Sequence, residues 1–341
     1  MFSFENDYSE GACPEVLNAL IETNYKQCPG YGNDEYCDKA KQLIKKEIGR
    51  DDVDIHFIPG GTPANMLATS LIKPYEAIIC ADNGHINVHE TGAIEAHGHK
   101  ILTSAGKDGK ITPEEIEAIA CKHTDEHMVK PKMVFISNPS EFGTIYSKKE
   151  LTEISNVCKK HNFYLYMDGA RLSCGLTAET NDVTLSDIAS LCDIFYIGGT
   201  KNGALLGEAM VIVNDELKPD FRYMLKRNGE MLAKSRVIGT QFMALMDNGL
   251  YINNAKNANS MAQQLKAIFE QYGIKMYLES YTNQIFPILD NKLLEKIKEK
   301  YVVTIWDKYD ENNTVIRFVC SWATKQENID QFAQDMEEFT K

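Results

Sequence analysis

No hydrophobic run in this sequence of 341 residues reaches the length of about 18 residues that a membrane-spanning helix needs. The first residues, Met1-Phe2-Ser3-Phe4-Glu5-Asn6-Asp7, also lack the basic segment and apolar core of a secretory signal. We therefore expect a protein with no membrane partner and a cytoplasmic location.

Paired cysteines and an excess of basic residues are missing as well. The nine cysteines are scattered and odd in number, and no C-x-x-C pair occurs, which argues against a disulfide framework and a cysteine-rich zinc site. Lysine and arginine number 36 against 49 acidic residues, and the net charge of −13 would repel a polyphosphate backbone. Nucleic acid is therefore not an expected partner.

Two common nucleotide-binding motifs, G-x-x-x-x-G-K-[ST] and G-x-G-x-x-G, are also absent. The sequence has instead Pro59-Gly60-Gly61-Thr62-Pro63 between an expected strand and an expected helix. We expect Thr62 at the N-cap and Pro63 at the first helical position, so that free amides and the helix dipole can hold a phosphate. A plain strand-to-helix turn is the alternative interpretation, because Gly-Gly-Thr is common in such turns.

Short apolar runs alternate with amphipathic segments from about residue 35 to 215, which predicts an α/β domain with a mostly parallel sheet flanked by helices. Sheets of this kind bind ligands outside the carboxyl ends of their strands. The expected strands are 55–58, 77–80, 133–136, 163–167, 194–197 and 209–213, with helices at 64–72 and 149–161 among the crossovers.

The last third of the chain has a different pattern, that of a smaller α+β module. A single core rarely outgrows about 250 to 300 residues, so two lobes are expected. We predict an N-terminal arm over 1–20, a large domain over 21–250 and a small C-terminal domain over 251–341, with the boundary inside a long helix. The small domain is expected to hold strands at 274–279, 285–289, 302–306 and 315–322 and helices at 292–300 and 327–339.

Two ionisable residues follow expected strands directly. Asp168 comes after the apolar run 163–167, and Lys201 comes after 194–197, two glycines and Thr200. A lysine freed of its proton by desolvation can form an imine with an aldehyde, and an aspartate can keep a heterocyclic nitrogen protonated. Together with the Gly60-Gly61-Thr62 turn, the pair suggests a pyridoxal 5'-phosphate (PLP) site. A surface lysine and a helix-capping aspartate are the alternatives.

Neighbouring residues have further candidate roles. Arg171 could pair with an acidic group, or it could hold the phenolate of the cofactor or a substrate carboxylate. Thr200 is placed to give its hydroxyl to the phosphate. His85 and His89 stand four apart, but without a third ligand a metal is not expected, and we expect His85 to stack on the cofactor ring.

These segments resemble the low-specificity threonine aldolase family, which belongs to the β-eliminating lyases among the fold type I PLP-dependent enzymes. The similarity runs from about Glu5 to the end of the chain. It rests on Gly60-Gly61-Thr62-Pro63-Ala64-Asn65, Asn83-Gly84-His85, Met167-Asp168-Gly169-Ala170-Arg171-Leu172, Thr200-Lys201-Asn202-Gly203 and the segment from Ile316 to Thr324.

The resemblance implies PLP as cofactor and a role for each matching residue. Lys201 would form the imine and Asp168 would pair with the pyridine nitrogen. The remaining roles are ring stacking by His85, phosphate binding by Gly61 and Thr62, and grip on the substrate carboxylate by Arg171 and Arg317. Tyr31 resembles a family tyrosine that reaches the site of a neighbouring subunit, which implies a homodimer or homotetramer.

The sequence departs from the family pattern at three places. Ser137-Asn138-Pro139-Ser140-Glu141 stands where the family has Glu-Asn-Thr-His-Asn, so a histidine associated with the β-hydroxyl is missing. Asn6 stands in place of a serine at the substrate carboxylate. A glycine-rich basic stretch is replaced, which leaves open whether Lys234 or Arg236 reaches the phosphate.

The sequence therefore predicts a carbon-carbon lyase that cleaves a β-hydroxy-α-amino acid to glycine and an aldehyde, with His85 or a water that it holds as the base. A β-eliminating lyase, a racemase or an aminotransferase is the alternative, because PLP permits each of these reactions. A PLP-binding protein without catalysis is a third possibility, which the absence of an appended basic or helix-turn-helix segment disfavours.

Overall fold

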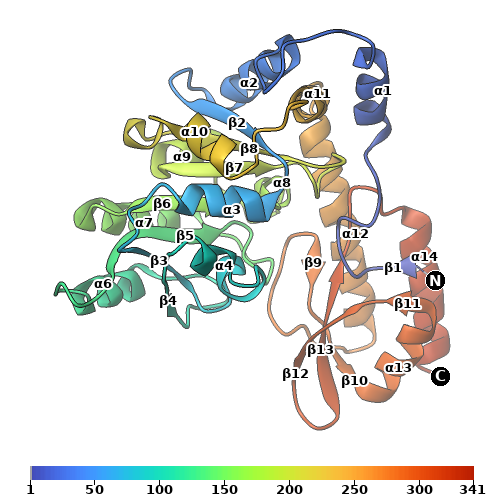
Figure 1. Ribbon diagram of the computed structural model, residues 1–341. Coiled ribbons are helices and arrows are strands. Elements are labelled where there is room, and N and C mark those ends of the chain that lie inside the picture. Colours follow the sequence, from blue (N-terminus) through green and yellow to red (C-terminus); the bar gives the residue numbers. More distant parts are fainter. Residues whose placement is uncertain (1) are drawn as a thin grey trace.

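A seven-stranded sheet in the order β2-β8-β7-β6-β5-β3-β4 forms the centre of the larger of two lobes in the computed structural model, which describes residues 2–341 (Figure 1). β8 is antiparallel to both of its neighbours, and every other adjacent pair is parallel. This confirms the α/β class and the mostly parallel sheet. The strands are β2 (Asp54–Ile58), β3 (Glu76–Ala81), β4 (Ile101–Ser104), β5 (Lys130–Ser137), β6 (Tyr164–Asp168), β7 (Ile194–Gly198) and β8 (Glu208–Ile212).

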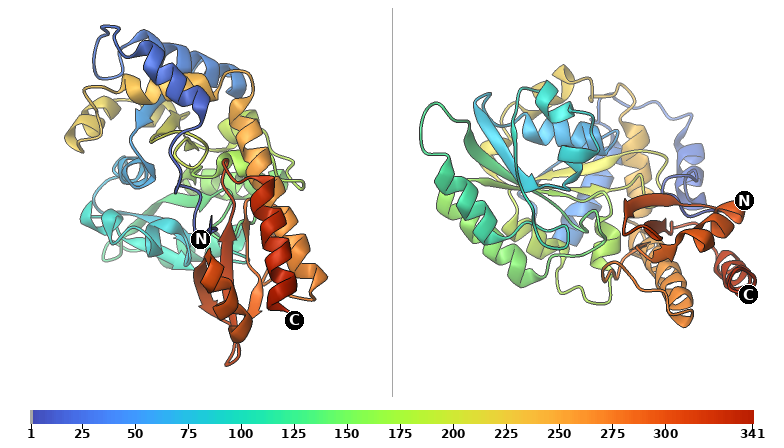
Figure 2. Two further views of the ribbon diagram at one scale, coloured as in Figure 1. Left: turned by 90° about the vertical axis from the view of Figure 1, so that its right-hand side faces the viewer. Right: turned by 90° about the horizontal axis from the view of Figure 1, so that it is seen from below.

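Helices cover both faces of this sheet because successive strand residues point to opposite sides (Figure 2). In β6, for example, Leu165 and Met167 pack into one core and Tyr166 packs into the other. One face holds α2 (Glu35–Ile48), α6 (Pro113–Lys122), α7 (Lys148–His161), α9 (Leu185–Leu191) and α11 (Arg236–Leu245). The other holds α3 (Gly61–Thr69), α4 (His85–Val88), α5 (Ala93–Ala96) and α10 (Phe221–Arg227).

Several of these helices begin at capping boxes, which fixes the loops that precede them. The Thr112 hydroxyl accepts the amide of Glu115 at the start of α6, and Glu115 in turn accepts the amide of Thr112. Ser147 and Glu150 form the same arrangement at the start of α7. Each connecting loop is therefore anchored by the strand before it and by the capping box of the helix after it.

The smaller lobe consists of an antiparallel sheet in the order β10-β13-β12, with β9 also paired to β13, and three helices. Its first helix, α12, runs from Leu250 to Gln271. The other elements are β9 (Gln284–Ile285), β10 (Ile288–Asp290), α13 (Asn291–Lys300), β11 (Tyr301–Val302), β12 (Thr304–Lys308), β13 (Asn313–Val319) and α14 (Gln326–Phe339).

The N-terminal segment crosses between the lobes before the chain enters the larger one (Figure 1). β1 (Phe2–Ser3) pairs with β11, and Phe4 is buried in the core of the smaller lobe. α1 (Pro14–Thr23) then packs against α11 of the larger lobe. The limits 1–20, 21–250 and 251–341 remain a prediction.

The expected strand over 274–279 is wrong. The segment is joined to 286–288 by an isolated bridge between Met276 and Pro287 and by hydrogen bonds such as Tyr277 N to Phe286 O, which do not make a continuous ladder. Alternating apolar residues show that a segment is partly buried. They do not show that a neighbouring strand is available to pair with it. Among residues 2–341, no helix is both long and apolar enough to cross a membrane.

Candidate active site

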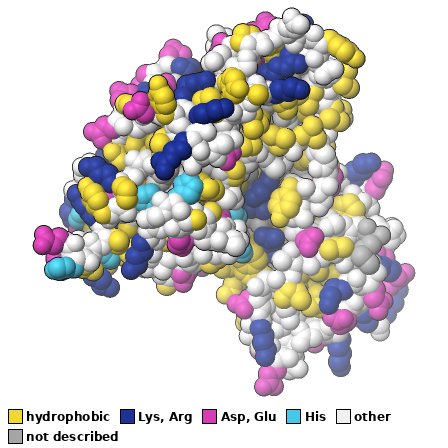
Figure 3. Space-filling view, in the orientation of Figure 1, with side chains coloured by type: hydrophobic (Ala, Val, Ile, Leu, Met, Phe, Trp, Pro, Cys, Tyr) yellow, Lys and Arg dark blue, Asp and Glu magenta, His cyan; other side chains and the backbone are white. Residues whose placement is uncertain are grey.

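A cavity of about 270 Å³ opens at the carboxyl ends of the parallel strands of the large sheet. The loops after β2, β3, β5, β6 and β7 all reach it, as expected for a sheet of this kind. In the space-filling view, basic side chains lie in the crease between the two lobes (Figure 3). The structure brings together eight of the predicted site residues on its wall: Gly60, Gly61, Thr62, His85, Asp168, Arg171, Thr200 and Lys201.

Lys201 lies in this cavity with no hydrogen bond or ion pair to its Nζ from any of residues 2–341. The ring centroid of Tyr8 lies 5.9 Å from Nζ. Burial, and then the charge of Arg171, lower the pKa of Lys201 below its usual value. An amine in this environment keeps more of its neutral, nucleophilic form.

Asp168 is held by three donors at the end of β6. Tyr196 Oη donates to Oδ1 over 2.5 Å, the amide of Ala170 donates to the same oxygen over 2.9 Å, and Asn65 Nδ2 donates to Oδ2 over 3.1 Å. Asp168 as a whole is only 5% exposed. Its position is therefore fixed before any ligand binds, and one face of Oδ2 remains free to accept a ring N–H.

Asn65 links Asp168 to a second buried carboxylate, Glu90, which the sequence analysis did not identify. Asn65 Nδ2 also donates to Glu90 Oε1 over 2.6 Å, while Tyr166 Oη donates to Asn65 Oδ1 over 2.6 Å. The same Glu90 oxygen lies 2.9 Å from Nδ1 of His85. A continuous chain of polar contacts therefore runs from the imidazole to the carboxylate at the end of β6.

This contact sets the chemistry of His85. An ionised Glu90 only accepts, so Nδ1 carries the proton and Nε2 is left for the cavity. Burial lowers the pKa of His85, but the hydrogen bond that it donates to Glu90 and the nearby acidic groups outweigh it, and the net shift is upward.

The start of α3 differs from the prediction. Gly60 is the N-cap, Gly61 is the first helical residue, and Thr62 and Pro63 are the second and third, so neither stands where we expected it. No side chain caps this end, which leaves the first amides available to an anion. A Cβ on Gly61 would lie 3.3 Å from Tyr196 Oη, so a bulkier residue there would crowd the floor of the cavity.

Thr200 makes two hydrogen bonds within the chain, and its role toward a phosphate stays a prediction. Its hydroxyl donates to Glu208 Oε1 over 2.7 Å and accepts the amide of Gly207 over 3.0 Å, while Glu208 Oε2 accepts the amide of Gly199 over 2.8 Å. Glu208 lies at this edge because β8 runs opposite to its neighbours, so its first residue meets their last. Burial raises the pKa of Glu208 to about 7, against the lowering effect of its hydrogen bonds.

Three predicted substrate residues do not line the cavity within this chain. Asn6 Oδ1 accepts the amide of Tyr8 over 2.9 Å and closes a local turn. Tyr31 is 43% exposed, with Lys226 Nζ 4.8 Å from its ring centroid. Arg317 stacks on Trp306 at 5.2 Å and has a buried Nε without a hydrogen-bond partner in the described chain. Their roles stay predictions.

The two candidates for a basic phosphate ligand also lie outside the cavity. Lys234 is exposed, and Arg236 donates to the carbonyl oxygens of Lys26 and Asn24 over 2.6 and 3.0 Å. Neither lines the cavity of its own chain, and the role of each toward the phosphate stays a prediction. Among residues 2–341, no group of three or more His, Cys, Asp or Glu side chains is arranged to hold a metal ion.

The sheet order, the lysine after β7, the aspartate at the end of β6 and the uncapped helix after β2 define the class of fold type I PLP-dependent enzymes. Solved structures of that class share the fold. The histidinol-phosphate aminotransferase from Clostridium acetobutylicum has a TM-score of 0.75 and 14% identity, covering 99% of this chain and 98% of its own.

Sequence comparison gives the family: β-eliminating lyases match residues 5–292, and the chain belongs to that family, as the sequence predicted. The chain is 33% identical to the low specificity L-threonine aldolase of Pseudomonas sp. over 98% of its length and 96% of that protein. A threonine aldolase structure from Leishmania major has a TM-score of 0.99 and 43% identity, with full coverage of both chains.

Proposed function

We propose that this enzyme cleaves a β-hydroxy-α-amino acid, such as threonine or allo-threonine, to glycine and an aldehyde with PLP as its cofactor. The observation that carries the proposal is the placement of Lys201 and Asp168 at neighbouring strand ends in one cavity. Similarity to proteins named low specificity L-threonine aldolase supports the substrate class.

The residues of the cavity fit PLP. Lys201 has a free Nζ to bind the aldehyde, Asp168 keeps an acceptor for the ring nitrogen, and the uncapped start of α3 suits the phosphate, with Gly60, Gly61 and Thr62 around it. When bound, the cofactor supplies an electron sink for the pair released from the broken bond.

The protein's own part is orientation and control of protons. Arg171 and Arg317 carry the positive charge that a substrate carboxylate requires, and fixing that carboxylate sets which bond at Cα lies perpendicular to the ring. The Glu90 contact holds His85 in one tautomer, and His85 lines the cavity that would hold the cofactor.

The test is glycine formation from threonine, allo-threonine and phenylserine by the purified enzyme supplied with PLP. Borohydride reduction should abolish the visible absorption of the cofactor. It should leave the reduced cofactor covalently attached to Lys201 as a label. Lys201→Ala should remove both activity and label, whereas Lys132→Ala, at a lysine that donates to Asn162 O outside the cavity, should keep both. Elimination, racemisation or transamination in place of cleavage would support the alternative PLP reactions, and no turnover at all would contradict the proposal.

We also propose that the chain forms a homodimer or homotetramer whose subunits share their sites. Leu17, Ile21 and Tyr25, on and just after α1, are 40%, 70% and 95% exposed. Figure 3 shows hydrophobic side chains gathered on that part of the surface. Large apolar groups exposed together are typical of an interface. Light scattering would test this, and a monomer at micromolar concentration would contradict it.

A further inference from the structure

Three acidic residues line the cavity, and only one of them has no hydrogen-bond donor within the described chain. Asp168 accepts from Tyr196, Ala170 and Asn65, and Glu208 accepts from Thr200 and Gly199. Glu141 accepts no hydrogen bond from residues 2–341, although it is only 8% exposed. Because Glu141 lines the cavity, its carboxylate is open to a hydrogen-bond donor that a bound ligand brings.

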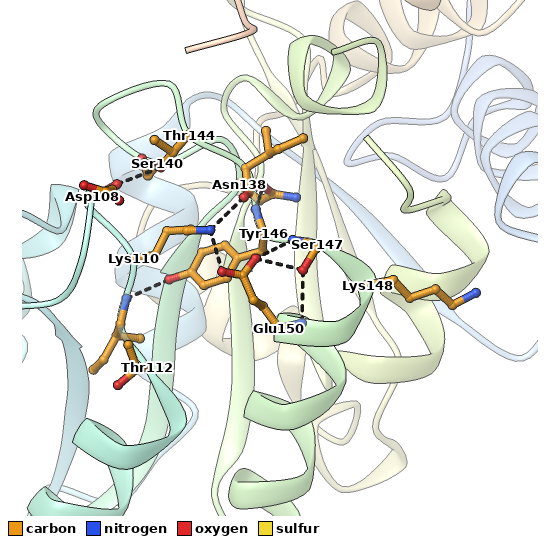
Figure 4. A network of polar contacts seen from close by, with 12 residues as sticks. Asp108, Lys110, Thr112, Asn138, Ser140, Thr144, Tyr146, Ser147, Lys148 and Glu150 are labelled. Atoms are coloured by element: carbon orange, nitrogen blue, oxygen red, sulfur yellow. Dashed lines mark hydrogen bonds and ion pairs between the residues drawn. The ribbon is translucent and has the colours of Figure 1, made fainter. Parts of the chain in front are cut away.

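The loop that carries Glu141 is held by hydrogen bonds on both of its sides. The loop therefore cannot easily move away from the cavity. Figure 4 shows the side facing α6 and α7, where the Thr144 hydroxyl donates to Asp108 O over 2.7 Å and Lys110 Nζ donates to Ile145 O over 3.0 Å. Lys110 also donates to Glu150 Oε1 over 2.6 Å. The turn is further closed by the amide of Gly143, which donates to Ser140 O over 2.9 Å.

The smaller lobe holds the same turn from the other side. Both the Ser280 and Thr282 hydroxyls donate to the carbonyl oxygen of Gly143 over 3.1 Å. A Cβ on Gly143 would collide with these two hydroxyl oxygens, and its φ of +73° favours glycine as well. The turn therefore lies between the two lobes and directs Glu141 into the cavity that they share.

The surroundings of Glu141 are cationic. Its charge raises the pKa values of His85 and Arg171 and opposes the lowering of the pKa of Lys201. It acts in the same upward direction on His89 and Arg317. Glu141 thus lies among the groups that the proposed function assigns to the cofactor and to the substrate carboxylate, near the place where a bound amino acid would present its side chain.

We propose that Glu141 accepts the hydrogen bond of the substrate's β-hydroxyl group and removes its proton during cleavage. This assignment rests on the proposed function. It replaces His85 as the expected base, and it places a carboxylate in the segment where the family has a histidine. A hydroxyl group donates the hydrogen bond that the Glu141 carboxylate lacks within the described chain. A positioned base of this kind contributes about 10²- to 10⁴-fold to a rate.

The step balances in protons and electrons. The β-hydroxyl proton moves to a Glu141 oxygen, the O–H electron pair becomes the second bond of the aldehyde carbonyl, and the Cα–Cβ bond breaks. The pair from that bond is accepted by the pyridoxal cofactor named in the proposed function. The proton on Glu141 then returns to solvent, or to Cα as glycine forms.

The experiment compares Glu141→Gln with the wild-type holoenzyme. We expect kcat for threonine or phenylserine to fall at least about 100-fold. Glycine has no β-hydroxyl, so its dissociation constant, measured from the visible absorption of the cofactor, should stay within about twofold. This binding measurement separates loss of the base from general damage to the site.

Two further variants make the test specific. Glu150→Gln changes a carboxylate that anchors the same loop from outside the cavity, and it should keep kcat near the wild-type value. If Glu141→Gln does not bind cofactor, Glu141→Asp decides, because it retains a carboxylate and should keep cofactor binding and measurable cleavage.

The outcomes separate the two proposals. Cleavage by Glu141→Gln within threefold of the wild type would overturn the role of Glu141 and leave the proposed function intact. Equal loss in Glu150→Gln, or an Asp variant that binds cofactor without cleaving, would also overturn it. A wild type that cleaves no β-hydroxy amino acid would overturn the proposed function and this assignment together.

Discussion

Arg171 and Asp7 form a two-point ion pair that is almost completely buried. Nε of the guanidinium lies 2.7 Å from Oδ2 and Nη2 lies 3.0 Å from Oδ1, with the two side chains 9% and 1% exposed. Asn283 Nδ2, from the smaller lobe, donates to the same carboxylate over 2.9 Å. The N-terminal segment therefore orients an arginine of the larger lobe and leaves its Nη1 side for a ligand.

Replacing Asp7 by Asn should strongly destabilise the apoprotein at neutral pH, because it leaves the buried Arg171 charge uncompensated. Removal of one partner from a buried pair costs about 3 to 5 kcal/mol. Burial raises the pKa of Asp7, but Arg171 and the other donors outweigh it and hold the pKa below 3.8. The contribution is therefore complete above pH 3.8 and is lost as the pH falls through the lower, folded-state value.

An exposed pair of the same geometry provides the control. Arg50 contacts Asp52 through Nε and Nη2 over 2.9 and 2.5 Å, with the Asp52 side chain 64% exposed. Asp52→Asn should change the denaturation midpoint little, because solvent screens this pair. Equal effects of Asp7→Asn and Asp52→Asn in urea titrations at pH 7 would contradict the role given to burial.

Local patterns in the sequence predicted the residues that follow a strand directly. Asp168 and Lys201 were found because parallel strands end at one edge, and the sheet gathers whatever follows them. Asp7 and Glu90 were missed because each contributes through a contact with a residue on another element, and sequence position does not show such contacts. Glu208 was missed because nothing in its sequence indicates that β8 runs opposite to its neighbours.

The same limit explains the error in the N-cap predicted at Thr62. A threonine before a proline is a sound N-cap by propensity. Here the helix starts earlier, because Gly60 adopts the extended cap conformation. The hydroxyl of Thr200 donates to Glu208, eight residues further along the chain, and its predicted role toward the phosphate stays a prediction.

Replacing Glu90 by Gln should lower the pKa of His85 in the apoprotein. The carboxylate contact is the largest of the effects that raise this pKa against burial, and an amide can no longer stabilise the imidazolium by charge. The stability that the raised pKa contributes is present below the unfolded-state value and is lost as the pH rises through the folded-state value. An NMR titration of the imidazole resonances measures the shift directly.

The matched control is Glu117→Gln, which removes the carboxylate 2.8 Å from His161 Nε2 on the surface. It should leave the His85 titration unchanged. A His85 curve that is the same in wild type and Glu90→Gln would show that the hydrogen-bonded chain from Glu90 to Asp168 does not govern the imidazole.

Gly143→Ala should destabilise the protein by about 1 to 3 kcal/mol, because a methyl group would press on two hydroxyls that join the lobes. Gly273→Ala separates this contact from backbone strain. Its φ of +69° matches the +73° of Gly143, but no atom lies within 4 Å of the added Cβ. We expect a clearly smaller loss for Gly273→Ala, and equal losses would mean that backbone conformation alone makes glycine necessary at position 143.

The stability of the apoprotein should fall as the pH rises through the range in which Glu208 titrates. Burial raises its pKa from 4.5 to about 7, so between these values the folded state retains a proton that the unfolded chain has released. A shift of this size corresponds to a free-energy change on the order of 3 kcal/mol, all of it lost once the pH exceeds the folded-state value.

Glu208→Gln does not titrate, so its denaturation midpoint relative to that of the wild type should rise between pH 5 and pH 8. The hydrogen bonds altered by the amide add a constant offset that does not depend on pH. Glu299→Gln, at an exposed position on α13, serves as control and should show no such trend. A difference between Glu208→Gln and wild type that stays constant from pH 5 to pH 8 would show that Glu208 is already ionised in the folded protein.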